Sequence, residues 1–358
     1  MVVKGLTAAL IMVNIVLLVL NYYVTHNIYQ SVGILHPFRA MSIVTGSIPL
    51  HNAINMMLFW IGLPCHLDLI HNLQSLLFVQ PTMDYSRWLD RARKRMFLVF
   101  GMSMAIPLVL RIIQFAFTLQ VLTQWLSLVS IVLIPMLWSW QTLPLLYFWF
   151  VCATLSMRFR ELKQRIIDYS SPVDDESVCE NLGMYFDQFC CLVRITKLTA
   201  KFLSTFMLTS IMFAVMILCF ALYFVIRSEA FVVIHNSSID NGDVFGKINS
   251  YFDYSWAILR VLIAAAYAVS ICKFGWAVNE QAQEVTEAAL FVKPKSENDC
   301  FQKLYFAQLE MGQRSWGITI FETYMIDRKL LTTIAATIVG YAIMLLEMKP
   351  TTVVAENY

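Results

Sequence analysis

The chain has 358 residues, of which 59% are hydrophobic and 14% are charged, and its formal net charge is +2. A soluble domain cannot hide so much apolar surface, because about half of the surface of a folded protein is already made of apolar atoms. The composition therefore excludes a soluble globular protein and predicts an all-α integral membrane protein in which residues 1–358 form one domain.

Seven apolar runs are each close to or longer than the ~20 residues that a helix needs to cross a bilayer. They cover residues 5–24, 46–66, 96–119, 126–155, 202–226, 256–278 and 330–348. The first run ends at Asn21-Tyr22-Tyr23 rather than at a small-residue cleavage site, so it is expected to be a retained span and not a signal peptide.

Basic residues are concentrated on one side of these predicted spans. Of the 26 lysines and arginines, 18 lie between the second and third, fourth and fifth, and sixth and seventh runs, and four lie in the opposite loops. Because positive charge stays on the cytosolic side, the N-terminus is predicted to be cytosolic and the C-terminus extracellular. A G-protein-coupled receptor has the reverse orientation, so that class is disfavoured.

The predicted inner face is larger than the outer face. Residues 156–201 and 279–292 continue the helical pattern of the spans into the cytosol, where the helices could pack as a bundle. The longest outer segment, 228–255, contains Asn236-Ser237-Ser238, which fits the N-glycosylation acceptor pattern. Asn236 is therefore a candidate glycosylation site.

No motif indicates catalysis. The chain has no phosphate-binding glycine loop, nucleophile elbow or zinc-protease motif, so we expect neither an enzyme nor a cofactor. His66 and Asp68 are two residues apart and face different sides of a helix, which disfavours a metal site.

Polar side chains within the second and third runs are candidates for function. His51, Asn52 and Asn55 lie about one helical turn apart, and they could line a cavity or bond to a neighbouring helix. Arg111 lies deep in the third run, where it could face a polar cavity or extend to the interface.

The seventh run carries polar side chains along one face. Thr333, Thr337, Tyr341 and Met344 are three or four residues apart, and Glu347 places a carboxylate near the outer end. Such a stripe needs something polar to face, which hydrogen bonds within one bundle or a water-filled pore between subunits would supply. In a symmetric oligomer Glu347 would form a ring of carboxylates that attracts cations; a glutamate in the headgroup region is the alternative.

The end of the chain resembles the C-terminal signature of the insect gustatory receptors. The segments that carry the resemblance are GITIF at 317–321, IDRKLL at 326–331 and GYAIMLLEM at 340–348. In that family an ID-x-x-LL stretch precedes a last span that ends TYxxxxxQF. Gly340 stands where the family has threonine, and Glu347-Met348 stands where it has Gln-Phe. The chain is thus similar to a divergent, gustatory-receptor-like member of the insect chemoreceptor superfamily.

The resemblance implies a ligand-gated, non-selective cation channel in the plasma membrane, opened by a small molecule in taste reception and assembled as a homo- or hetero-tetramer. Its partners would be the bilayer, the ligand and permeating cations, with no nucleic acid. Carried over by position, the pore and gate residues are Thr337, Met344, Glu347 and Met348. Candidates for the ligand pocket are Trp60, Arg111, Phe115, Trp138 and Tyr267.

Two alternatives to a channel are kept. The same fold could lack channel activity and serve as a scaffold or as a subunit that needs a partner, which the departures from the family signature motivate. A transporter is less favoured, because the sequence shows no internal repeat.

Overall fold

The structure is a computed structural model of the chain. It describes residues 37–78, 83–117, 124–169, 175–226, 244–290, 316–320 and 323–347, together with positions 9, 12, 13, 15, 16 and 19 of the first apolar run. The elements are α2 (Pro37–Ile61), α3 (Leu63–Phe78), α4 (Met83–Phe117), α5 (Gln124–Tyr169), α6 (Asp175–Ile226), α8 (Val244–Leu290), β1 (Thr319–Ile320), β2 (Tyr324–Met325) and α10 (Arg328–Glu347). The described residues are therefore mostly helical, as predicted, with one antiparallel hairpin in addition.

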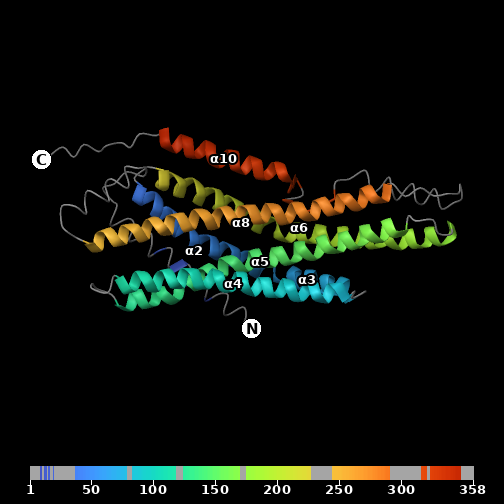
Figure 1. Cartoon of the computed structure of the whole chain (residues 1–358), viewed down its shortest axis with the longest axis horizontal. Coiled ribbons are helices and arrows are strands. Elements are labelled where there is room, and N and C mark those ends of the chain that lie inside the picture. Colours follow the sequence, from blue (N-terminus) through green and yellow to red (C-terminus); the bar gives the residue numbers. More distant parts are fainter. Residues whose placement is uncertain are drawn as a thin grey trace.

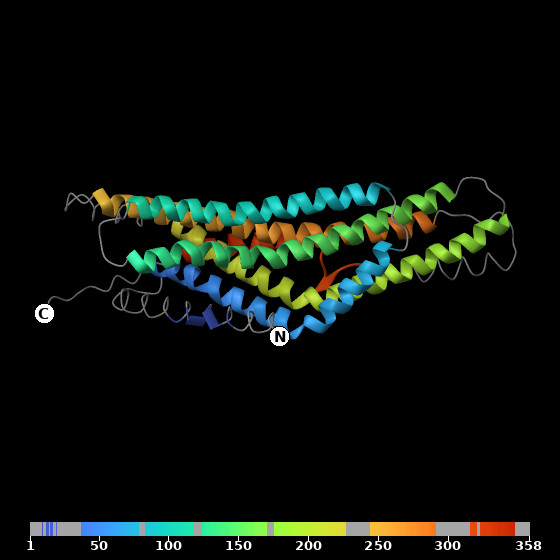
Figure 2. The same cartoon turned by 90° about the horizontal axis from the view of Figure 1, so that it is seen from below.

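The long helices run side by side in one elongated bundle (Figure 1). α4 lies along one edge and packs against α5 and α8, whereas α10 lies along the opposite edge and packs against α6 and α8. The view turned by 90° shows α2 and α3 meeting at an angle on the side away from α4 (Figure 2).

Three of these helices are too long for a bilayer alone. α5, α6 and α8 contain 46, 52 and 47 residues, which is roughly 70–80 Å at 1.5 Å per residue against a hydrocarbon core of about 30 Å. They extend beyond α10 at one end of the bundle (right in Figure 1). The prediction that helices continue past the apolar runs is confirmed in length, while the side of the membrane on which they do so stays a prediction.

The helical extensions share a packed core. The buried face of α5 recurs every three or four residues, as expected for an amphipathic helix. Its fully or nearly fully buried side chains are Phe148, Val151, Cys152, Leu155, Phe159, Leu162 and Ile166, and they pack against apolar faces of α6 and α8. Burial of this continuous stripe holds the extended parts of the three helices together.

In the described part of the chain, three helices are long and apolar enough to cross a membrane: Gln141–Asp168, Gly183–Phe220 and Ile258–Leu290. The pair Ile48–Ile61 and Pro64–Leu73, bent by 72°, would make a fourth span if it counts as one. The predicted first span lies almost wholly outside the described residues. Seven crossings and the orientation of the termini therefore stay predictions.

The chain bends between α2 and α3, inside the predicted span 46–66. Pro64 has no N–H to donate to the turn before it, and this releases the backbone at that point. Gly62 sits at the bend because Phe202 of α6 approaches it closely; a Cβ at Gly62 would lie 2.6 Å from the Phe202 ring. Any larger residue at position 62 would push the bend away from α6.

Candidate functional site

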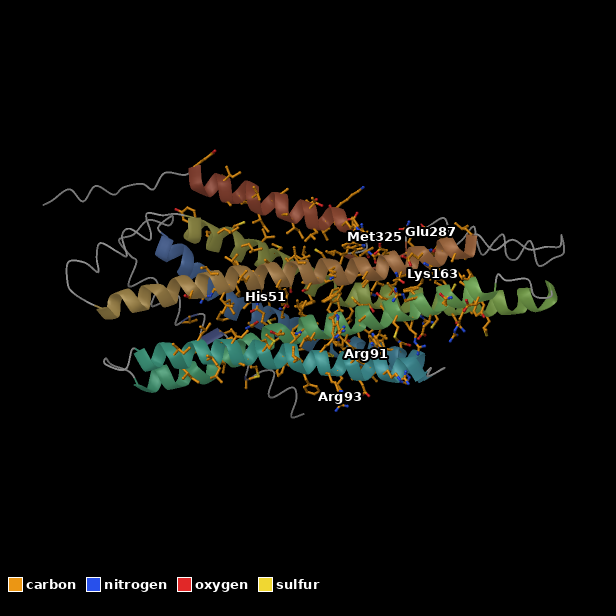
Figure 3. All side chains as sticks on the ribbon, viewed as in Figure 1. His51, Arg91, Arg93, Lys163, Glu287 and Met325 are labelled. Atoms are coloured by element: carbon orange, nitrogen blue, oxygen red, sulfur yellow. The ribbon has the colours of Figure 1, made fainter. Side chains whose placement is uncertain are left out.

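A cluster of polar side chains lies buried where α2, α6 and α8 meet. Asn55 Nδ2 lies 3.0 Å from His51 Nε2, one turn away on α2, and His51 Nε2 lies 3.2 Å from Ser210 Oγ on α6. Ser210 also hydrogen-bonds Tyr267 of α8, whose hydroxyl donates to the backbone carbonyl of Gln141 on α5 at 3.2 Å. His51, within the bundle in Figure 3, is 1% exposed. The cluster thus joins four helices through an apolar interior.

The hydrogen bonds of His51 determine where its ring proton lies. Asn55 Nδ2 can only donate, so His51 Nε2 accepts and a neutral imidazole carries its proton on Nδ1. Among the residues that the structure describes, neither His51 Nδ1 nor Asn55 Oδ1 has a hydrogen-bond partner. Leaving such a buried atom without a partner costs about 1–3 kcal/mol. One donor and one acceptor are therefore available, on adjacent turns of one helix, to a molecule that reaches the cluster.

Aromatic rings border the histidine. The centroid of the Phe213 ring lies 4.6 Å from that of His51, and the Tyr267 ring meets His51 edge-on at 6.2 Å. A few polar atoms between aromatic walls are typical of sites for small, largely apolar molecules. No group of three or more metal-binding side chains lies together within the described ranges.

The residues predicted to line the ligand pocket do not all converge on this cluster. Tyr267 belongs to it and is buried. Trp60 is 41% exposed and lies five residues beyond Asn55 on α2, outside the buried cluster, so it is not brought there. Arg111 and Phe115 belong to α4 and Trp138 to α5, but their side chains lie outside the described residues.

The sequence left open whether His51, Asn52 and Asn55 line a cavity or bond to a neighbouring helix. The contact of His51 with Ser210 shows that this face of α2 bonds to α6. The sequence analysis did not identify Ser210 as part of the cluster. It could have been found as a serine within the apolar run 202–226, because polar groups inside a membrane helix need partners.

One line of apolar side chains along α10 faces the bundle. Ile334 and Ala342 are buried, with Ile338 partly buried between them, so the stripe recurs every four residues. It packs against α6 and α8. At the start of the helix, Asp327 Oδ1 accepts a hydrogen bond from the backbone N–H of Leu330 at 2.9 Å, which satisfies one of the free donors of the first turn. α10 is thus held at its start and along one side.

The opposite side of α10 carries the residues predicted to line a pore. Thr337, Met344 and Glu347 are exposed in the single chain, and Met348 lies outside the described residues. The Thr337 hydroxyl donates to the backbone carbonyl of Thr333, 2.8 Å away. The threonines therefore do not need a polar surrounding, contrary to expectation, because their own helix accepts their hydroxyl protons.

The hairpin of β1 and β2 fastens the start of α10 to α8. Asn279 of α8 donates from Nδ2 to the backbone carbonyls of Ile318, at 3.2 Å, and Ile326, at 2.8 Å. It accepts a hydrogen bond from the Ile318 N–H at 2.5 Å. The guanidinium of Arg328, the first residue of α10, lies 4.1 Å from the centroid of the Trp276 ring on α8. The beginning of α10 is therefore attached to α8.

The fold is similar to that of a solved insect olfactory receptor. The insect olfactory receptor OR5 from Machilis hrabei in complex with eugenol superposes with a TM-score of 0.68, covering 96% of this chain and 88% of the receptor at 14% identity. Without eugenol the same receptor gives a TM-score of 0.69 at 13% identity and the same coverage. The likeness is one of fold, and it agrees with the resemblance to the insect chemoreceptors that the C-terminal segments carry.

Sequence comparison gives one curated relative at low identity. The probable G-protein coupled receptor egl-47 of Caenorhabditis elegans is 24% identical over 366 residues, which cover 95% of this chain. The chain spans about two thirds (66%) of the length of that relative. No protein-family profile matches the chain.

Proposed function

We propose that the chain is a gustatory-receptor-like member of the insect chemoreceptor superfamily and a subunit of a ligand-gated, non-selective cation channel in the plasma membrane. The observation that carries the proposal is the likeness of fold, over 96% of the chain, to an olfactory receptor that was solved with a small molecule bound. The C-terminal segments 317–321, 326–331 and 340–348 support the gustatory branch.

The exposed face of α10 supports assembly around a pore. The helix has 20 residues, about 30 Å, which matches the hydrocarbon core. Large side chains on its outward face, including Tyr341 and Met344, are about half exposed in the single chain. In a tetramer with α10 toward the axis, Met344 and Met348 would form the apolar gate and Glu347 a ring of carboxylates at the outer mouth.

The buried cluster supports a small, largely apolar ligand. The His51 Nδ1 proton and the Asn55 Oδ1 atom would pair with one hydroxyl group, which can accept from the first and donate to the second, while Phe213 and Tyr267 contact the apolar body of the ligand. Each such hydrogen bond is worth about 0.5–1.5 kcal/mol. Binding would therefore stabilise one arrangement of α2, α6 and α8 over another.

Whole-cell recording of the expressed chain tests the pore. Currents would be evoked by a panel of small phenols and alcohols headed by eugenol, and Glu347→Gln and Glu347→Lys would be compared with the unchanged chain. A carboxylate some 7 Å from a cation in water contributes roughly 0.6 kcal/mol, so four contribute roughly 2.4 kcal/mol. Removing all four should therefore lower the inward cation current by up to about 50-fold, less where salt screens the charges, and lysine should lower it further. Unchanged selectivity and conductance in both variants would remove Glu347 from the pore.

Dose–response curves test the ligand cluster. His51→Leu and Asn55→Leu should each raise the half-maximal concentration about tenfold, which corresponds to one lost hydrogen bond. The matched control is His66→Phe, because His66 is a buried histidine of α3 whose ring stacks on Phe59 at 4.6 Å, outside the cluster. Equal shifts in all three variants would mean a general effect on folding and no ligand site at His51.

A receptor that signals through G proteins is the second candidate, because the nematode relative egl-47 is named as a probable G-protein coupled receptor. The distribution of basic residues opposes it, since the seven predicted spans would place 18 of them on the same side as the N-terminus. An antibody against an N-terminal tag decides the matter. Binding in intact cells would favour the G-protein-coupled orientation, and binding only after permeabilisation would favour the channel.

A non-conducting subunit is the remaining alternative. It would be silent when expressed alone and would yield current only with a second subunit. The likeness of fold covers 96% of the chain, which gives this alternative no particular support.

A further inference from the structure

The first turns of α4 carry a group of exposed basic residues that the proposed channel mechanism does not use. The five side chains are exposed, and they are Arg87, Arg91, Arg93, Lys94 and Arg95. They span more than two turns, or about 12 Å of helix. In the part of the chain that the structure describes, none of the five forms an ion pair. We call these five residues the cationic face.

Two basic residues of the neighbouring helix α5 are paired. On α5, Arg158 contacts Glu161 at 2.8 Å, and Lys163 contacts Glu284 of α8 at 3.0 Å. The cationic face contains one acid, Asp90, which is also exposed and forms no ion pair within the described residues. Among the residues whose side chains the structure describes, carboxylates thus pair two basic residues of α5, whereas the five basic residues of α4 have no such partner.

The outward side of α4 becomes apolar within one turn of the cationic face. Phe97, Leu98, Met102 and Val109 are exposed and lie on the same side of the helix. An exposed apolar surface of this kind faces lipid tails. Leu98 is seven residues from Arg91, a rise of about 10 Å. The cationic face is therefore at the depth of the lipid headgroups.

The position of α4 leaves this side open. α4 packs against α5 and α8 and forms an edge of the bundle in both views (Figures 1 and 2). Arg93, labelled in Figure 3, points away from the neighbouring helices. α10 lies along the opposite edge of the bundle. In the proposed tetramer α10 faces the axis, so α4 lies at the perimeter and meets the bilayer; this step rests on the proposed function.

We propose that the cationic face of α4 binds the anionic headgroups of the leaflet that it enters. The five charges spread around more than half of the helix circumference, so they cannot converge on one phosphate group. The geometry fits a surface of many singly charged headgroups, such as phosphatidylserine, better than one polyphosphorylated lipid. A basic residue near such a surface adds about 1 kcal/mol of attraction, which screening by salt reduces.

The test uses the full-length chain in nanodiscs of phosphatidylcholine that contain spin-labelled phosphatidylserine or spin-labelled phosphatidylcholine as the probe. The motionally restricted fraction of each probe gives the preference for the anionic lipid. We expect a preference in the unchanged chain, and a loss of about fivefold in R91Q/R93Q/K94Q, as one contact of about 1 kcal/mol per bound lipid predicts. Arg87 and Arg95 remain to keep the orientation of the chain.

Two further variants make the result specific. R160Q/R194Q/K201Q removes three exposed basic residues from α5 and α6 and should keep the preference. R91K/R93K/K94R exchanges arginine and lysine at constant charge and should also keep the lipid preference. Attraction to a surface of many headgroups depends on the charge and not on the two-pronged hydrogen bonding of a guanidinium group.

Three results would overturn the proposal: no preference in the unchanged chain, an equal loss in the α5–α6 variant, or a loss in the charge-conserving variant. The last would indicate a specific phosphate site. Lipid preference is measured without recording current. A chain that conducts no current but keeps its preference for the anionic lipid would therefore contradict the proposed function and leave the lipid proposal standing.

Discussion

Replacing Asn279 by alanine should detach the hairpin from α8 without unfolding the long helices. Asn279 makes the three hydrogen bonds that fix the hairpin, and its side chain is buried. Ile318 and Ile326, whose backbone groups it binds, are both fully buried. The space next to Asn279 is equally restricted, because a Cβ on Gly317 would collide with Asn279 Oδ1.

The size of the effect follows from counting the groups that would lose their partner. The carbonyl of Ile318 keeps a hydrogen bond, since it also accepts from the N–H of Ile326 at 3.2 Å. Two groups remain, the N–H of Ile318 and the carbonyl of Ile326. At about 1–3 kcal/mol for each buried group without a partner, Asn279→Ala costs roughly 2–6 kcal/mol. Even the lower bound raises the population of the open hairpin about 30-fold.

Limited trypsin digestion measures this opening, because Arg328 and Lys329 follow the hairpin directly. The initial cleavage rate at these residues tracks the open population when reclosing is fast. The control is Gln283→Ala, one turn further on α8, whose side chain is exposed and bonds only Glu287 in the described structure, at 3.2 Å. Equal initial cleavage rates for the Asn279→Ala variant and the unchanged chain would refute the role assigned to Asn279.

Two further predictions concern single side chains. Thr337→Val should change single-channel conductance by less than about twofold, because its hydroxyl proton already bonds the Thr333 carbonyl and offers permeating ions little; a large loss of conductance would show that the oxygen meets the ion. Lys163→Ala removes a pair that is about one-third exposed on both partners, so thermal unfolding in detergent should show a loss of no more than about 1 kcal/mol. A loss of several kcal/mol would mean that the pair is shielded from solvent.

The long helices could be predicted from the sequence because their signal is local. Apolar runs and the three-to-four-residue spacing of side chains such as Leu162 and Ile166 indicated helices that continue past the bilayer, and the structure has them. The bend at Gly62 was missed, although Pro64 was visible, because the apolar run 46–66 continues through both positions. Hydropathy gives length and not direction.

The site was only partly predictable because its contacts join distant parts of the chain. His51 and Asn55 could be identified as polar residues on one helix face, but their neighbour Ser210 is 159 residues from His51 in the sequence. Trp60 was selected for its ring alone, and the packing of α2 leaves it on the outside. No periodicity indicates which helix faces which.

The hairpin shows the same limit more sharply. Its strands contain two residues each, too few for a period-2 pattern to be seen. Its position depends on Asn279, which is 39 residues from Ile318. The side-chain amide of Asn279 makes three hydrogen bonds to the backbone of a short loop, and these bonds hold the start of α10 in place beside α8.

α8 connects the two parts of the candidate site. It carries Tyr267 of the polar cluster and Asn279 of the hairpin clamp, about three turns or roughly 18 Å apart on one helix. A ligand that shifts α8 at Tyr267 would therefore shift the start of α10, which is bonded to α8 through Asn279. The shift opens a pore only if the ligand binds the two arrangements with different affinity. Asn279→Ala separates the two steps: ligand affinity should persist while the current it evokes is lost, whereas unchanged current would show that α10 is moved by another route.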